Sequence, residues 1–537
     1  MKKILLLIIT LFLSAQSINS QTVVLDANGV TVKWTGTTVP NPRFVQASPR
    51  GTLEWFAIVD NTSKSFITQY AIFGQSNYFT PQGNSIPIPF NNIVTTLVTD
   101  MSSDNFNAVN GYYGMFGLDF NQPIGSWDVS NVTAMKNMFR QTPLFNQPIG
   151  SWNVSNVTDM GSMFQNSTAF NQSIGSWNVS NVSNMNQMFD RATAFNQPIG
   201  SWNVSNVTDM SYMFLRASAF NQPIGSWNVS SVTDMSAMFY ENTAFNQPIA
   251  SWNVSNVTNM SSMFAGASAF NQPIGFWNVS NVTDMVGMFG GFSAFNQNIG
   301  SWNVSNVTDM SYMFSGNSTF NQPIGSWNVS NVVDMSYMFK EATAFNQPIG
   351  SWNVSNVGGL REMFAGASAF NQNIGSWNLS NVTLMLSMFS GVQLSTANYD
   401  ATLIGWATIG PNETPLQQNV EFDGGNSNYC NGEAARNTLI STYSWTITDA
   451  GLNCELSTET FDTTVLKLYP NPVKSVLNVK VDSNFISQPY SIVDGLGRVV
   501  LNGNLNEVDT AINVEQLSKG IYYLKLSDSK ASKFVKE

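Results

Sequence analysis

The sequence predicts a repeat solenoid, in which every coil contains a short parallel strand and a short helix, followed by a small antiparallel β-sandwich. Phe-Asn-Gln recurs eleven times at an unbroken spacing of 25 residues, from Phe120 to Phe370. Trp and Met recur at fixed places in the same unit, and alternating apolar runs replace the repeats after residue 464. A constant period without insertions indicates coils that superimpose and share one continuous core.

Composition limits the functions that the 537-residue chain can have. Asp and Glu number 33 against 22 Lys and Arg, a net charge of −11, which argues against nucleic acid and anionic membranes as partners. The chain has no His and two Cys, so Ser-His and Cys-His nucleophile pairs and thiolate metal clusters are excluded. We therefore expect no enzyme, no cofactor and no metal centre.

The N-terminal part contains two predicted segments. Residues 1–21 have the basic start, short apolar run and small polar exit of a signal peptide, too short to span a bilayer as a stable helix. Residues 22–97 are rich in Thr, Val and aromatics without a helical period, which predicts a strand-rich cap that closes the open end of the solenoid. A separate ligand-binding domain is the alternative for this segment.

The repeats are predicted to occupy residues 98–394, as eleven full copies from residue 120 and a degenerate first copy. In the copy 195–219, Trp202 and Val204 are expected on one side of a short strand. The apolar residues that follow recur mostly at three- and four-residue steps, which predicts a helical turn with Thr208 as its N-cap and Asp209 at its positive end. This combination predicts a parallel-strand solenoid of leucine-rich-repeat type.

The motif W-x-V-S-N-V-T-D-M-S-x-M-F resembles the repeats of the BspA-like leucine-rich-repeat surface proteins of bacteria. The resemblance implies a cell-surface or secreted adhesion and interaction module. Residues 395–454 look like the end cap that follows such repeats. Cys430 and Cys454 have no third cysteine to compete with them, so in an exported protein we expect them to form a disulfide.

The C-terminal residues change character again. Residues 455–464 are predicted to be a linker, and residues 465–537 a small antiparallel β-sandwich. Four motifs, ending with the residues that we take as the sorting signal, resemble the C-terminal sorting domain of type IX (Por) secretion cargo: Tyr469-Pro-Asn-Pro472, Asp494–Arg498, Leu517–Tyr522, and Lys533, Phe534, Val535 and Lys536. The resemblance implies the type IX machinery as a partner and a mature protein that is released or attached at the outer cell surface.

The positions that vary between copies are the candidate ligand contacts. Freedom to vary inside a fixed unit indicates solvent exposure, and these positions form either an inert outer face or a ligand-contact strip. The candidate contact residues are Tyr212, Arg216, Tyr240, Tyr312, Tyr337 and Arg361.

Four sets of recurring columns allow two interpretations each. The Trp202 column fits core packing or a glycan platform, and the Met210 and Met213 columns fit core packing or a soft-metal ladder. The Asp209 column, Asp in six copies, fits a helix N-terminus or a Ca²⁺ site. The Asn at positions 196, 203 and 206 fit stacked amides, and Asn203-Val-Ser205 and Asn206-Val-Thr208 also match the glycosylation acceptor pattern.

These observations predict a secreted or cell-surface repeat protein that acts as an adhesion or protein-interaction scaffold for an unknown extracellular ligand. The alternative is a carbohydrate-binding accessory surface protein. A two-carboxylate glycosidase is disfavoured because the repeats contain no invariant acid pair.

Overall fold

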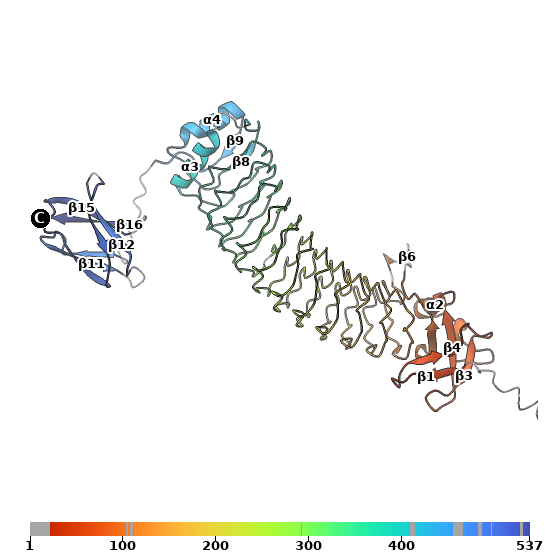
Figure 1. Cartoon of the computed structure of the whole chain (residues 1–537). Helices are drawn as coiled ribbons and strands as arrows, with labels where there is room; N and C mark the ends of the chain where they lie inside the picture. Colours follow the sequence, from red (N-terminus) through yellow and green to blue (C-terminus); the bar gives the residue numbers. More distant parts are fainter. Residues whose placement is uncertain are drawn as a thin grey trace, which may run out of the picture. The chain divides into compact units, whose positions relative to one another are not determined.

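A computed structural model of the chain divides into two compact units, Met1–Cys454 and Glu455–Glu537 (Figure 1). The structure describes residues 22–103, 106–107, 111–112, 114–291, 293–408, 414–454, 466–481, 486–495, 497–526 and 530–537. The predicted signal peptide, residues 1–21, and the predicted linker, residues 455–464, lie outside the described residues.

The first unit begins with small sheets. Two antiparallel strands pair first, β1 (Val23–Leu25) and β2 (Val32–Trp34). A three-stranded mixed sheet follows, in which β4 pairs antiparallel with β3 and parallel with β5: β3 (Phe44–Ala47), β4 (Glu54–Asp60) and β5 (Ile93–Leu97). A short hairpin comes next, β6 (Phe106–Asn107) and β7 (Gly111–Tyr112).

This N-terminal region also contains a helix that the sequence did not predict. Helix α2 (Ser65–Phe73) and the 3-10 turns η1 (Ser76–Phe79) and η2 (Phe90–Asn92) lie between β4 and β5. The connection from β4 to β5 joins two parallel strands, and parallel strands need a crossover, which a helix commonly supplies. The absence of a helical apolar period in this segment therefore gave the wrong expectation for α2.

The predicted leucine-rich-repeat solenoid, with a strand and a helix in every coil, is wrong. The helices and strands of the described residues all lie before residue 113 or after residue 395, in small antiparallel or mixed sheets with few helices. We call residues 120–394 the repeat stack. Its described residues form turns joined by one isolated parallel bridge per coil, such as that between Asp209 and Asp234. Figure 1 accordingly draws the repeat stack with neither ribbons nor arrows.

Backbone hydrogen bonding explains why no helix forms. The N–H of Met210 donates to the carbonyl of Asp234 at 3.1 Å, and the N–H of Tyr212 to the carbonyl of Ser236 at 2.8 Å, both in the next coil. An α-helix needs these same groups for bonds four residues apart within one segment. Thr208 is not an N-cap, because its N–H and its hydroxyl both point to the carbonyl of Ser183 in the preceding coil.

The core of the repeat stack is built from columns of identical side chains. Phe214 and Phe220, the first residue of the next copy, stack at a centroid distance of 3.9 Å. Trp202 and Trp227, one coil apart, lie at 6.5 Å with nearly parallel rings. The indole N–H of Trp202 donates to the carbonyl of Ile174 at 3.1 Å, so the one polar atom of the ring is satisfied inside the core.

The first unit ends with two helices and a pair of parallel strands: α3 (Thr396–Ala407), β8 (Glu421–Asp423), α4 (Glu433–Tyr443) and β9 (Thr446–Thr448). The bridge between Met385 and Phe422 joins the last coil to β8. The predicted disulfide between Cys430 and Cys454 is present, with its Cα atoms 4.9 Å apart.

The second unit consists of two antiparallel sheets. The first has the order β10-β11-β14 and contains β10 (Leu466–Tyr469), β11 (Val476–Val481) and β14 (Asp509–Asn513). The second has the order β13-β12-β15-β16 and contains β13 (Val499–Asn504), β12 (Pro489–Asp494), β15 (Gly520–Leu526) and β16 (Lys530–Lys536). Buried Leu477 and Val479 of the first sheet and Leu524 and Phe534 of the second belong to one hydrophobic core, which fits the β-sandwich predicted here.

Candidate binding surfaces

The positions that vary between copies coincide with an unusual backbone conformation. Tyr212 and Arg216 have φ angles of 59° and 53°, and their counterparts in the other ten full copies also have positive φ. Tyr212 is 39% exposed, whereas Met213 and Phe214 beside it are fully buried. We call the columns of Ser211, Tyr212, Leu215 and Arg216 the variable strip.

The first group of predicted contact residues lies around Arg216. Its guanidinium Nε is 2.8 Å from a carboxylate oxygen of Glu241 in the next coil, and it lies over the ring of Tyr240 at 5.8 Å. The hydrogen bond from Arg216 lowers the pKa of Glu241, and the same bond raises the pKa of Arg216. The pair therefore remains fully ionised at neutral pH, and each of its members holds the other in place.

A buried carboxylate lies beside this pair. Asp190 is 3% exposed, accepts a hydrogen bond from Gln165 at 2.6 Å and forms an ion pair with Arg191 at 3.1 Å. Burial raises the pKa of Asp190, and its polar partners only partly oppose that rise.

The second group of predicted contact residues begins three coils further along, at Tyr312. Tyr312 and Tyr337 stack at a centroid distance of 4.4 Å, and the Arg361 guanidinium lies over the Tyr337 ring at 5.7 Å. Lys340 lies over the same ring at 5.5 Å and pairs with Glu362 at 2.8 Å. Burial, followed by the neighbouring Tyr337, raises the pKa of Tyr312.

The structure thus places five of the six predicted contact residues in two clusters, and Tyr212 on the same strip. Sequence reasoning missed the residues that fix their side chains, namely Asp190, Glu241, Lys340 and Glu362. All four occupy the variable columns, so the signal that could have found them was an acidic or basic residue in the same copy as a Tyr or Arg candidate or in the copy beside it.

The side chains of the recurring columns pack or form hydrogen bonds within the repeat stack. The repeat Trp side chains are at most 4% exposed and the Met column is fully buried, which excludes a glycan platform on Trp202 and leaves both columns as core. Asp209 accepts bonds from the N–H and the hydroxyl of Ser211, at 2.9 and 2.6 Å, so the predicted helix N-terminus is replaced by a turn. Among the described residues, no group of three acidic, Cys or His side chains could hold a metal ion.

The amide columns bond mainly along the stack, as stacked amides should. The carbonyl oxygen of the Asn196 side chain accepts from the N–H of Asn221 at 3.0 Å and from Gln222 at 2.9 Å. Asn206 donates to the carbonyl of Ser180 at 2.7 Å, also one coil away. Asn203 instead accepts from Ser205 within its own coil.

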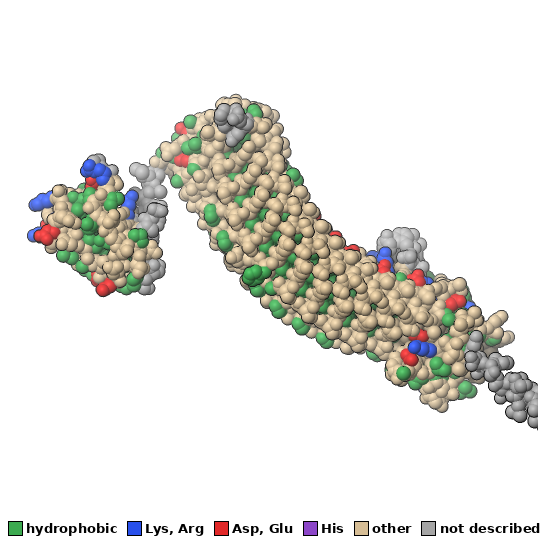
Figure 2. Space-filling view, viewed as in Figure 1, with side chains coloured by type: hydrophobic (Ala, Val, Ile, Leu, Met, Phe, Trp, Pro, Cys, Tyr) green, Lys and Arg blue, Asp and Glu red, His purple; other side chains and the backbone are tan. Residues whose placement is uncertain are grey.

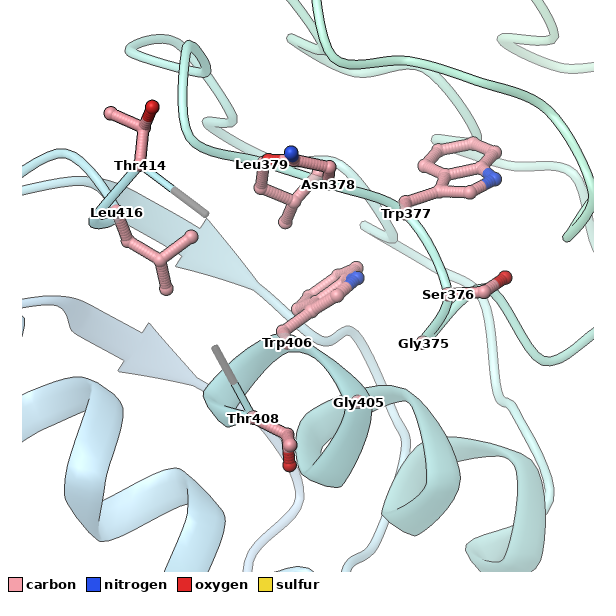
Figure 3. Close-up of a pocket in the computed structure, with 10 residues that line it drawn as sticks. All are labelled: Gly375, Ser376, Trp377, Asn378, Leu379, Gly405, Trp406, Thr408, Thr414 and Leu416. Carbon is pink, nitrogen blue, oxygen red and sulfur yellow. The ribbon is translucent and has the colours of Figure 1, made fainter. Parts of the chain in front are cut away.

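A hollow of about 370 Å³ lies where the last coil meets α3 (Figure 3). Trp377, Leu379 and Trp406 line it with almost fully buried side chains, and exposed Ser376 and Thr408 lie at its rim. The indole N–H of Trp406 donates to the carbonyl of Ile374 at 3.1 Å, which extends the bonding pattern of the repeat Trp column into α3.

A second hollow, of about 490 Å³, lies on the repeat stack around Phe276. It is lined by Pro273, Gly275, Phe276, Gln297, Asn298, Gly300, Ser301, Pro323 and Ser326, none of which carries a charge. Figure 2 shows that charged side chains are sparse over the visible face of the repeat stack.

The predicted sorting-signal residues lie on β16. Phe534 is fully buried in the core of the second unit, Lys536 is mostly buried and Lys533 is exposed. The side-chain oxygen of Asn471 accepts from the N–H of Val535 at 2.8 Å. Two of the motifs, whose bonded residues are 64 positions apart in the sequence, are therefore joined in the folded unit.

Comparison with known families shows to which family the repeats belong. They match the family described as "Mycoplasma protein of unknown function, DUF285" over residues 99–224, 194–301 and 283–402, which together span more than half of the chain. The chain belongs to the DUF285 family. This match supports a repeat surface protein and does not extend to the predicted BspA-like identity. A search of curated proteins found no match.

Beyond the DUF285 repeats, residues 467–537 match the family described as "Secretion system C-terminal sorting domain". This match confirms the predicted sorting domain and indicates export by the type IX secretion system. It also implies that this DUF285 protein is secreted or located at the outer cell surface. None of the helices in the described ranges is long and apolar enough to cross a membrane.

Proposed function

We propose that this DUF285 protein is a surface-displayed or secreted scaffold that binds an extracellular protein through the variable strip. The observation that carries the proposal is the pair of clusters around Arg216 and Tyr337 on the variable strip. The sequence resemblance to BspA-like surface proteins, which implies an adhesion role, also supports it.

The composition of the two clusters suits protein recognition. Tyr and Arg are enriched among residues that dominate the binding energy of protein interfaces. Glu241 and Glu362 already hold the Arg216 and Lys340 side chains, so less conformational entropy is lost when a partner binds. Because the two clusters occupy one stack, weak contacts at both of them combine into higher avidity.

The test is binding of the purified full chain to immobilised fibronectin, fibrinogen, laminin and collagen, measured by surface plasmon resonance. Tyr337→Ser removes the centre of the second cluster, and the same column carries Ser in other copies, such as Ser162 and Ser262, so the fold is retained. We expect at least one of the four proteins to bind and the variant to lose about tenfold in affinity or more. Absence of binding to all four, or equal affinity of the variant, would contradict the proposal.

Asn228→Ser is the matched control for that experiment. Asn228 lies outside the variable strip, and its side chain accepts a bond from the N–H of Ser230 within its own coil. We expect this variant to bind like the unmodified chain.

We further propose that the protein is not an enzyme, and turnover of any member of a polysaccharide panel would overturn that statement.

Carbohydrate binding is the second candidate function. The observation that favours it is Phe276, an exposed aromatic side chain outside the variable strip, beside an uncharged hollow.

A further inference from the structure

Phe276 does not contribute to folding in the way that its counterparts do. The residue before the repeat Trp is Ser in ten of the eleven full copies and Phe in this one. In the next copy, the hydroxyl of Ser301 donates to the carbonyl of Gly275 at 2.8 Å, a bond that a Phe side chain cannot make. Phe276 is instead 92% exposed, the highest value among the large hydrophobic side chains that the structure describes. Because the Phe276 side chain is hardly buried, it adds almost nothing to the free energy of folding. Its presence therefore needs a reason other than the stability of the fold.

The hollow beside Phe276 contains a second departure from the repeat. Asn298 occupies a position that is Pro in eight of the eleven copies, and it lies in the coil next to Phe276. Two unusual side chains, one aromatic and one an amide, therefore line the same hollow. Pro273 and Pro323 add further apolar surface to it.

The polar groups of the hollow retain hydrogen-bonding capacity. The side-chain oxygen of Asn298 accepts from the N–H of Gly300 at 3.0 Å, and the amide NH₂ group is a separate donor. Gln297 donates its NH₂ to Asn271 at 3.0 Å, and its side-chain carbonyl is a separate acceptor. The Ser301 hydroxyl donates to Gly275 and can itself accept. Donors and acceptors thus line the same hollow as Phe276 and the two prolines.

We infer that this hollow binds a sugar unit of a neutral glycan, with Phe276 as the platform for the apolar face of the ring. A hexose has one apolar face and an edge of hydroxyl groups, which matches an aromatic ring next to amide and hydroxyl side chains. The absence of charge among the nine lining residues favours a neutral sugar over an acidic one. The side chains of an apolar peptide would match Phe276 and the prolines, but only its backbone could bond the amides of Gln297 and Asn298, whereas a hexose presents hydroxyl groups all along its edge.

The test uses the purified full chain and hexasaccharides of the cello-, xylo-, manno-, malto- and laminari- series, with an oligogalacturonate as the acidic comparison. Binding is measured by glycan microarray and then by isothermal titration calorimetry. We expect at least one neutral series to bind more tightly than oligogalacturonate. Absence of binding to all five neutral series, or a preference for the acidic glycan, would overturn the inference.

Phe276→Ser is the decisive variant, because it restores the residue of the other ten copies and therefore keeps the fold. We expect it to weaken binding of the selected hexasaccharide by about tenfold or more. Phe276→Trp, which keeps an aromatic platform, should retain binding. Equal affinity of Phe276→Ser and the unmodified chain would overturn the inference.

This inference is independent of the proposed protein scaffold. The hollow and the variable strip share no residue, so Phe276→Ser should leave binding to the extracellular proteins unchanged, and Tyr337→Ser should leave glycan binding unchanged. Either proposal can therefore fail while the other holds.

Discussion

The Trp column and the variable strip are made by the same 25-residue unit, yet they obey opposite rules. Trp recurs in all eleven copies, and neighbouring rings such as those of Trp202 and Trp227 are nearly parallel. At the positions of Tyr212 and Arg216 the copies carry aromatic, acidic, basic, small and amide residues on one backbone conformation. Identity is required where each side chain packs against its own counterpart in the next coil. Variation is tolerated where the side chain lies at the surface, even though the backbone there is left-handed.

The difference also separates stability from recognition. A change in a buried column should weaken folding and leave the partner surface intact in the molecules that remain folded. A change in the variable strip should weaken partner binding and leave the stability of the fold unchanged. Three substitutions test this separation.

The largest effect is expected for Trp227→Ala. The ring is 3% exposed, packs between neighbouring Trp and Phe columns and donates its indole N–H to Ile199 at 3.1 Å. Loss of a buried aromatic side chain of this size costs about 3–5 kcal/mol of unfolding free energy. Urea denaturation followed by tryptophan fluorescence measures it. Tyr212→Ser on the strip is the control, with an expected change within about 0.5 kcal/mol. Similar losses for the two variants would break the comparison.

A smaller effect is expected for Asn221→Ala in the amide column. The Asn221 side-chain oxygen accepts from the N–H of Asn246 and from the Gln247 amide, both at 3.0 Å. Its removal leaves a backbone donor without that partner and should cost about 1 kcal/mol. Asn221→Asp keeps an oxygen in the same place and should lose less in the same urea titration. If Asp and Ala are equally destabilising, these inter-coil bonds do not stabilise the stack.

The smallest effect is expected for Glu241→Gln. Arg216 lowers the pKa of the Glu241 carboxyl, so the ion pair stabilises the fold above the ordinary Glu pKa of 4.5, and that stability is lost as the pH falls through the lowered pKa. Both side chains are about two-fifths exposed, and solvent screening limits the effect at pH 7 to less than about 1 kcal/mol. Thermal unfolding at pH 7 and at pH 3 measures it. A difference that persists at pH 3 would mean that the ion pair is not its cause.

The buried columns could be predicted from the sequence and the backbone of the repeats could not. The recurrence of Trp202 and Met213 in every copy, and of Met210 in every copy but the one with Leu360, places them in the core, as found. The steps of three and four residues between the apolar residues after Val207 predict a helix. The prediction is wrong because apolar spacing does not reveal which carbonyl each backbone N–H bonds. In the folded chain half of those groups bond to a neighbouring coil, and Tyr212 and Arg216 adopt positive φ angles that non-glycine residues rarely adopt.

The candidate surfaces were only partly predictable for a related reason. The two clusters depend on pairs such as Arg216 and Glu241 that are 25 residues apart, so the partner of each candidate becomes evident only once the coils are aligned. Phe276 was visible as a single substitution in an otherwise constant Ser column, but its exposure depends on the side of the coil to which that column points.

The parallel bridges of the repeat stack give the array a direction, and both of its ends are covered. Ala134 in the first full copy bridges back to Asp100, and Met385 in the last copy bridges forward to Phe422 of β8. An array with bare ends would present one row of donors and acceptors that fits the opposite end of a second molecule. Such head-to-tail joining has no point at which it closes, and it would grow into a fibre. We therefore expect the segments before and after the repeats, which meet the first and last copies through these bridges, to oppose such end-to-end growth.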